Sequence, residues 1–209
     1  MRRRLPKLAV LASVCALAGP AAQAPASIPS VFRPVAGNPA EKLAAQPIDP
    51  YRYDYAKRCI KHPQPGMLAM QSWLERHARG VSWGIMRCEK LSGSSYSLHS
   101  EGRAIDWHLD VHSGSDRREA ERLIKLFLAP DREGNNHALA RRMGIQELIW
   151  NCHSWWAGDG GMQRYSACFD RKGRSKRVDD TTAHRNHIHI GLNRAGARKR
   201  TSFWRRAAG

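Results

Sequence analysis

Residues 97–112 read Ser97-Leu-His-Ser-Glu-Gly-Arg-Ala-Ile-Asp-Trp-His-Leu-Asp-Val-His112, and their pattern sets the architecture expected of the whole chain. Over residues 104–111 apolar and polar side chains alternate, and this period of two predicts a β-strand. Trp107, Leu109 and Val111 are expected on one face of the strand, and the carboxylates and imidazoles between them on the other. A sheet with such a polar face either exposes that face to water or uses it for function.

The segments around this strand predict both helices and further strands. Apolar residues at helical spacing predict helices over residues 67–78, 115–128 and 137–143. Apolar and β-branched runs predict strands over residues 81–86, 145–150 and 187–192. Because the two kinds of element do not alternate strictly, we expect an α+β domain in which helices flank a small antiparallel sheet.

The first fifty residues differ in composition from the rest of the chain. Residues 1–26 have a basic start, an apolar run and then small residues, which is typical of a signal peptide of a secreted protein. The apolar run is shorter than the ~20 residues that cross a bilayer, so we expect no permanent membrane anchor. Residues 27–50 are rich in Ala and Pro and predict an extended linker, which leaves residues 51–205 for the folded domain.

Four cysteines remain after the expected signal peptide. An even number of cysteines in a chain bound for an oxidising compartment predicts two disulfides. Proximity along the chain favours the pairs Cys59 with Cys88 and Cys152 with Cys168. A zinc site built from these cysteines is the alternative, but no C-x-x-C pair supports it.

The chain is strongly basic, with a formal net charge of +17. A basic surface concentrates a protein near polyanions, which outside a cell are wall polymers such as peptidoglycan and lipid headgroups rather than DNA. A solvated basic face accounts for the charge equally well. The basic clusters at residues 171–177 and 198–200 lack the interleaved aromatic residues of a nucleic-acid platform, so no nucleic-acid partner is expected. The sequence does not indicate an oligomeric state.

A spaced motif within residues 97–106 carries a resemblance to a known family. Five residues form the pattern S-x-H-x-x-G-x-A-x-D, and a later H-x-H follows about eighty residues on: Ser97, His99, Gly102, Ala104 and Asp106, then His187 and His189. A tight turn at the glycine lets the first histidine and the aspartate converge, and the last two histidines share one face of a strand. The pattern resembles the zinc D-alanyl-D-alanine peptidase group, which also includes hedgehog amino-terminal domains and phage endolysins.

The resemblance covers roughly residues 81–192 and implies a hydrolytic zinc site. Its ligands would be His99, Asp106 and His189, which leave the fourth position of a tetrahedral ion for a water of pKa about 7. Arg87 would polarise the scissile carbonyl or hold substrate, and Ser97 would hydrogen-bond to the substrate or to the frame of the site. The expected activity is hydrolysis of amide bonds in peptidoglycan stem peptides, by a carboxypeptidase at a D-Ala terminus or an endopeptidase at a cross-bridge.

One position departs from the family pattern. The peptidases have a carboxylate three residues before the last ligand that takes the proton from the water, and this chain has Asn186 there. The hedgehog-type acid six residues before the ligand is replaced by Ala183. An amide orients a water but cannot accept its proton at neutral pH. From its direction on the strand His187 is the expected base, and the alternatives are His184, Asp179 and Asp180.

Two other functions stay open. The first is a catalytically weak or inactive zinc-containing module that binds cell-wall polymers, motivated by Asn186 and by the basic charge. The second is a secreted nuclease that uses the His-rich strand with a divalent metal, which would leave the pattern of residues 97–106 unexplained.

Two groups of residues have more than one possible role. Trp150, Trp155 and Trp156 either line a groove for glycan or peptide stems or belong to the core. Glu101 and Asp110 are expected to be solvated, or to support a ligand, rather than to catalyse.

Overall fold

The structure is a computed structural model that describes residues 46–91, 93 and 95–206. The expected signal peptide, residues 1–26, and residues 27–45 of the expected linker lie outside the described residues. Residues 46–50 pack on the domain, because the backbone carbonyl of Gln46 accepts hydrogen bonds from Arg142 and the Asp49 carboxylate accepts from Ser202. The last residues of the expected linker therefore contribute to the fold.

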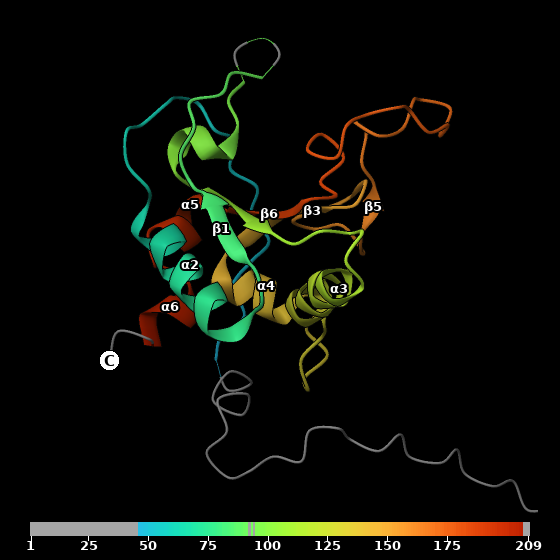
Figure 1. Ribbon diagram of the computed structural model, residues 1–209. Coiled ribbons are helices and arrows are strands. Elements are labelled where there is room, and N and C mark those ends of the chain that lie inside the picture. Colours follow the sequence, from blue (N-terminus) through green and yellow to red (C-terminus); the bar gives the residue numbers. More distant parts are fainter. Residues whose placement is uncertain (1–45, 92, 94, 207–209) are drawn as a thin grey trace, which may run out of the picture. The chain divides into compact units, whose positions relative to one another are not determined.

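The described residues form an α+β domain around a six-stranded sheet in which every strand pair is antiparallel (Figure 1). In sheet order the strands are β1 (Val81–Gly84), β2 (Ala104–His108), β6 (His187–Leu192), β3 (Ile145–Trp150), β4 (His153–Trp156) and β5 (Gln163–Arg164). The helices are α2 (Pro65–His77), the short 3-10 helix η1 (Leu98–Glu101), α3 (Gly114–Leu128), α4 (Ala138–Met143), α5 (Arg194–Ala197) and α6 (Ser202–Arg206). The expected α+β architecture with an antiparallel sheet is confirmed.

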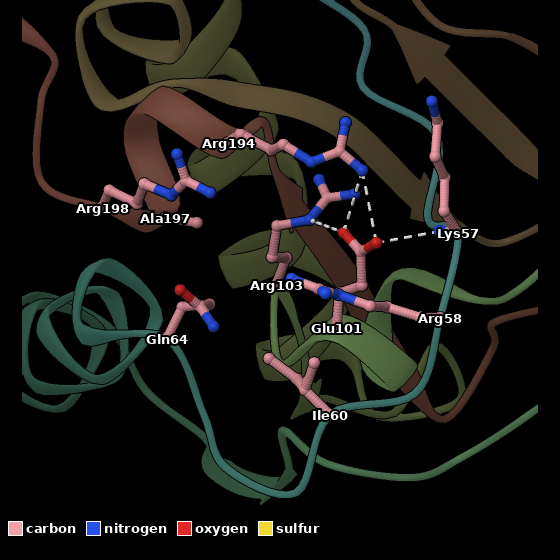
Figure 2. A pocket seen from close by; sticks show the side chains of 9 residues that line it. All are labelled: Lys57, Arg58, Ile60, Gln64, Glu101, Arg103, Arg194, Ala197 and Arg198. Carbon is pink, nitrogen blue, oxygen red and sulfur yellow. Dashed lines mark hydrogen bonds and ion pairs between the residues drawn. The ribbon is translucent and has the colours of Figure 1, made fainter.

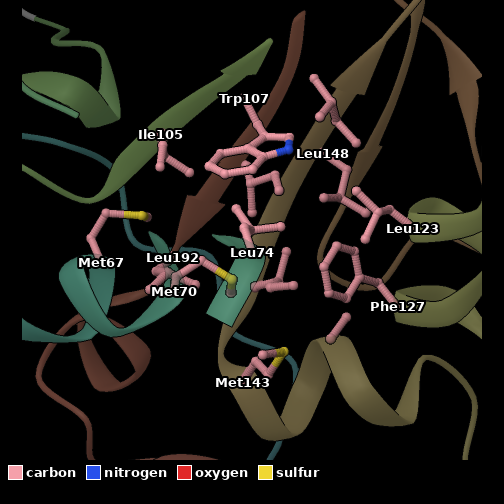
Figure 3. Close-up of a cluster of buried hydrophobic side chains, with 14 of the residues drawn as sticks. Met67, Met70, Leu74, Ile105, Trp107, Leu123, Phe127, Met143, Leu148 and Leu192 are labelled. Atoms are coloured by element: carbon pink, nitrogen blue, oxygen red, sulfur yellow. The ribbon is translucent and has the colours of Figure 1, made fainter. Parts of the chain in front are cut away.

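One face of the sheet packs against helices. Helices α2, α3 and α4 lie on the same side of the sheet, and their apolar side chains form one core with those of β2, β3 and β6 (Figures 1 and 3). Trp107 is buried in this core, and its indole nitrogen donates a hydrogen bond to the backbone carbonyl of Arg79. Trp150 and Trp155 are buried in the same core, so they line no groove.

Local sequence signals explain where the two long helices begin. Helix α2 starts with Pro65 at its first position, where a missing N–H costs nothing, and buries Met67, Met70 and Leu74 at helical spacing. In α3 the side chain of Ser113 accepts a hydrogen bond from the backbone N–H of Asp116, which caps the first turn. Both helices match the positions expected from periodicity to within two residues.

Strand β2 is shorter than its alternating sequence predicts. The strand ends at His108, whereas alternation extends to residue 111. The reason is a turn, because Asp110 accepts hydrogen bonds from the backbone N–H groups of His112 and Ser113 and directs the chain into α3. Asp110 is thus a turn residue and supports no ligand.

The two expected disulfides, Cys59–Cys88 and Cys152–Cys168, are present. All four cysteines are used, so a zinc site made of cysteines is excluded. None of the helices within residues 46–206 is long and apolar enough to cross a membrane. The disulfides are compatible with an extracellular protein.

The register of the sheet collects polar residues on the face opposite the core. Asp106 of β2 pairs with His189 of β6, and His108 pairs with His187. On the other side of β6, Glu147 of β3 pairs with Gly191. Since side chains alternate along a strand, Asp106, His187, His189 and Glu147 all point away from the helices.

Candidate metal centre

Three side chains of this polar face bring their ligand atoms together. Nε2 of His99 lies 3.1 Å from Oδ1 of Asp106 and 3.1 Å from Nδ1 of His189, and the last two atoms are also 3.1 Å apart. A tetrahedral ion with bonds of about 2.0–2.1 Å needs ligand atoms roughly 3.3–3.4 Å from one another. All three residues are buried, and together they form a group that can hold a metal ion. The trio predicted from the sequence is therefore brought together.

The turn of η1 positions His99. Ser97 precedes η1, and its hydroxyl accepts a hydrogen bond from the backbone N–H of His99. Gly102 closes the turn at φ 63°, a left-handed conformation that favours glycine, and its N–H donates to the carbonyl of His99. Nδ1 of His99 lies 2.8 Å from the carbonyl oxygen of Ile85, to which it can only donate. The proton is thus on Nδ1, and the lone pair of Nε2 faces the other two ligand atoms.

A second carboxylate orients His189 from behind. Nε2 of His189 is at ion-pair distance, 3.1 Å, from Oε1 of Glu147, and Oε2 of Glu147 accepts a hydrogen bond of 3.0 Å from the Tyr53 hydroxyl. A carboxylate on the outer nitrogen of a ligand histidine fixes the ring and its tautomer, and here it directs Nδ1 toward Asp106. Sequence reasoning missed Glu147 and Tyr53. The available signal was a single acidic residue inside the predicted strand 145–150, every residue of which is buried in the structure.

The electrostatics of the trio favour a bound cation. Burial alone would raise the pKa of Asp106, but its close contacts with the imidazoles of His189 and His99 hold it far below its ordinary value. Burial alone would lower the pKa of His189, but Asp106 and Glu147 raise it to about 9. The two carboxylates therefore stabilise a positive charge at this imidazole. A metal ion at Nδ1 would use the same attraction.

Arg87 lies beside the trio at the edge of the sheet. Its guanidinium donates to Oδ2 of Asp106, and its Nε donates to Glu89 at 3.1 Å. The contact occupies the second oxygen of Asp106 and leaves Oδ1 for the trio. The Arg87 side chain is 47% exposed, so part of its guanidinium remains accessible from the cleft described below.

His187 and Asn186 form a pair next to the trio. Nδ1 of His187 lies 2.8 Å from Oδ1 of Asn186, whose amide nitrogen donates to the Thr181 hydroxyl at 3.0 Å. Nε2 of His187 is buried, has no hydrogen-bond partner among the described residues and lies 3.5 Å from Oδ1 of Asp106. The Asn186 oxygen accepts the Nδ1 proton, so the free lone pair of His187 is on the nitrogen that faces the trio.

The alternative bases differ in how close they lie to the trio. The ring of His184 lies tilted against that of His187, with centroids 4.6 Å apart, and burial lowers the pKa of His184 to about 3 and that of His187 to about 4. Asp179 caps its own turn by accepting hydrogen bonds from Thr182. Asp180 pairs with His112 and Arg185. Both aspartates are exposed and engaged elsewhere, so neither takes the place of the missing acid.

His189 of the trio lines a cleft of about 450 Å³. Arg87, Ser97, His184, His187 and His189 line it, so the residues predicted to bind substrate are placed beside the candidate ligands. Aromatic residues from four segments form much of the remaining wall: Tyr53, Tyr55, Tyr96, Trp156 and Tyr165. Of the three tryptophans considered for a groove, Trp156 alone lines this cleft.

Comparison with known proteins identifies one family. A model of the family described as VldE, C-terminal domain, matches residues 59–184. The matched region contains His99, Asp106 and Glu147 and ends before His189. No curated protein and no solved structure matches the chain.

Proposed function

The chain belongs to the VldE C-terminal domain family, and we propose that it is a secreted zinc hydrolase that cleaves amide bonds in peptidoglycan stem peptides. The observation that carries the proposal is the convergence of the ligand atoms of His99, Asp106 and His189, the last of which lines a cleft. The resemblance of residues 97–106 to the zinc D-alanyl-D-alanine peptidases supplies the substrate class.

The donor set supports zinc as the metal. Two imidazole nitrogens and one carboxylate oxygen are typical of catalytic zinc sites, which keep one position open. Both histidines already have their outer nitrogens engaged, by the carbonyl of Ile85 and the carboxylate of Glu147. When bound, zinc supplies a Lewis acid for the carbonyl and lowers the pKa of a water toward neutrality.

His187 takes the role of general base in this proposal. Its Nδ1 proton is held by Asn186, so Nε2 presents a lone pair close to Asp106 and can accept a proton from the attacking water. The same nitrogen can then return that proton to the leaving amine. Asn186 acts as a positioning residue, which explains how the chain dispenses with the acid that the peptidases have at this place.

In this proposal Arg87 both holds the metal ligand Asp106 and binds the substrate. One part of its guanidinium holds Oδ2 of Asp106, which keeps that carboxylate in place. The remaining N–H groups can donate to the scissile carbonyl oxygen as negative charge develops on it. A fixed cation beside the reacting carbonyl stabilises the transition state more than the ground state.

Digestion of purified peptidoglycan, followed by analysis of released fragments, tests the proposal. The zinc-loaded wild type should release peptide fragments, and His187→Gln should lower the rate by about 100-fold to 10,000-fold while keeping its zinc. His153→Gln is the matched control, because His153 is exposed and bonds only to the carbonyl of Asn151. No fragments from a zinc-loaded wild type would contradict the proposal.

A zinc-stabilised module that binds wall polymers without cutting them is the second candidate. Asn186 favours it, because an amide stands where the related peptidases have their base. Asn186→Asp separates the two functions. A large gain in hydrolysis over an inactive wild type would mean that the site lacks only its base. Unchanged wall binding with no hydrolysis from either form would support the module.

A further inference from the structure

A second pocket, of about 310 Å³, lies between the segment before α2, the end of η1 and helix α5 (Figure 2). It contains none of the candidate metal ligands, and we call it the basic pocket. Its floor is the buried carboxylate of Glu101, which accepts hydrogen bonds from Nε of Arg103 at 2.9 Å and from the backbone N–H of Lys57 at 2.8 Å. Arg194 adds contacts of 3.2 and 3.3 Å to the two carboxylate oxygens. The sequence predicted that Glu101 would be solvated or would support a metal ligand. In the structure it is instead buried and bound to these basic residues.

The Glu101 carboxylate is already paired with Arg103 and Arg194. Burial raises the pKa of Glu101, but the N–H of Lys57 and the guanidiniums of Arg103 and Arg194 lower it below its ordinary value. The remaining donors of Arg103 bond to the backbone carbonyls of Leu192 and Asp54. Among the described residues that line the pocket, Glu101 alone is acidic. It has no capacity left to neutralise further cations.

Two arginines at the pocket have no partner for their charge. The side chains of Arg58 and Arg198 are exposed and make no hydrogen bond or ion pair with any other described residue. Figure 2 shows Arg58 coming from the segment before α2 and Arg198 from the end of α5. The ammonium of Lys57 points away from the other labelled side chains. The basic pocket therefore presents two free guanidiniums around a saturated floor.

We propose that the basic pocket binds a phosphate group of an anionic polymer, at Arg58 and Arg198. Guanidinium groups bind phosphate oxygens with paired hydrogen bonds, and a tetrahedral phosphate presents oxygens toward both arginines at once. A phosphate monoester carries more negative charge near neutral pH than a carboxylate does, so two unpaired guanidiniums favour it. The inference is independent of the hydrolase function, because a phosphate here needs neither the metal nor the cleft.

A polymer phosphate fits the pocket better than a membrane surface does. Proteins that lie on a membrane insert large apolar or aromatic side chains beside their basic residues. Within the part of the chain that the structure describes, two apolar side chains line the basic pocket: Ile60, which is partly buried, and Ala197, which is buried. The exposed large hydrophobic residues of the described chain, such as Leu68 and Trp83, do not line it. The pocket is therefore a hollow for a charged group without an apolar anchor.

Titration calorimetry of the full chain with a soluble glycerol-phosphate polymer and with inorganic phosphate tests the site at one fixed ionic strength. The test variant is Arg58→Gln with Arg198→Gln. The matched control is Arg171→Gln with Arg177→Gln, which removes the same charge from two exposed arginines outside the pocket. Loss of two charge-assisted contacts should weaken binding of both probes by at least about tenfold in the test variant. Binding by the control should stay within about twofold of the wild type.

Three results would overturn the proposal. Equal weakening in the test and control variants would mean that net charge alone attracts the polymer. Acetate binding as tight as inorganic phosphate, at the same ionic strength, would contradict the chemical class. Loss of binding to phosphatidylglycerol vesicles in the test variant, with polymer binding intact, would identify a lipid surface as the partner instead. Thermal unfolding of each variant verifies that the exposed substitutions leave the fold intact.

Discussion

Replacement of Glu147 tests how the candidate centre holds its metal, because Glu147 touches no metal and acts only through His189. Its Oε1 lies 3.1 Å from Nε2 of His189, and both side chains are buried. Loss of a carboxylate behind a ligand histidine typically lowers metal affinity by about 10-fold to 100-fold. Glu147→Ala should reach the upper value, since it removes the carboxylate altogether. Glu147→Gln should reach the lower one, because an amide oxygen keeps a partial negative charge beside Nε2.

Competition with a chromophoric zinc chelator measures the affinity of each purified variant. Tyr53→Phe should have a smaller effect than either change at Glu147, because Tyr53 contacts Oε2 of Glu147 and not the imidazole. Glu119→Gln is the control, since this carboxylate pairs with Arg122 on α3 and lies outside the trio. Wild-type zinc affinity in folded Glu147→Ala would refute the idea that the carboxylate orients His189.

Three further predictions concern stability. Replacing Cys59 and Cys88 by Ser should lower the free energy of unfolding by about 3–4 kcal/mol in urea denaturation, because the bridge spans 29 residues of chain; a change below about 1 kcal/mol would contradict this. Gly102→Ala should lower the free energy of unfolding by about 1–3 kcal/mol, measured by thermal melting, since φ is 63° and a Cβ would lie 2.6 Å from the carbonyl of His62; an unchanged melting temperature would argue against the turn. Burial raises the pKa of Asp131, but hydrogen bonds from Asn135 and Arg142 lower it to about 2. The resulting stabilisation is present above the ordinary pKa near 4 and is lost as pH falls toward 2. Asp131→Asn should therefore lower the free energy of unfolding by about 2 kcal/mol at pH 6 and by much less at pH 2. Equal stability of the variant and the wild type at pH 6 would mean that Asp131 is unpaired in solution.

Much of the fold follows from local sequence signals. Alternation along residues 104–108 and 187–192 places Trp107 in the core and Asp106 and His189 on the opposite face, as the structure has them. The turn between His99 and Asp106 is also local, because one glycine determines it. The grouping of the three candidate ligands was therefore predictable from two short segments, once those strands were assumed to be neighbours.

Contacts between distant segments were not predictable. Glu147 meets His189 only because β3 pairs with β6 in one register, and it meets Tyr53 only because the segment before α2 crosses the sheet. Neither pairing has a signal in the local sequence. The burial of Glu101 against Arg103 was not predicted for a related reason. Charged residues suggest an exposed surface until their partners are known.

The central claim is that His99, Asp106 and His189 hold one zinc ion, and elemental analysis of the purified protein tests it most directly. The chain is saturated with zinc, dialysed against metal-free buffer and compared with His189→Ala. We predict one equivalent of zinc in the wild type and a large loss in the variant. Absence of zinc from a folded wild type, or one full equivalent in His189→Ala, would contradict the claim.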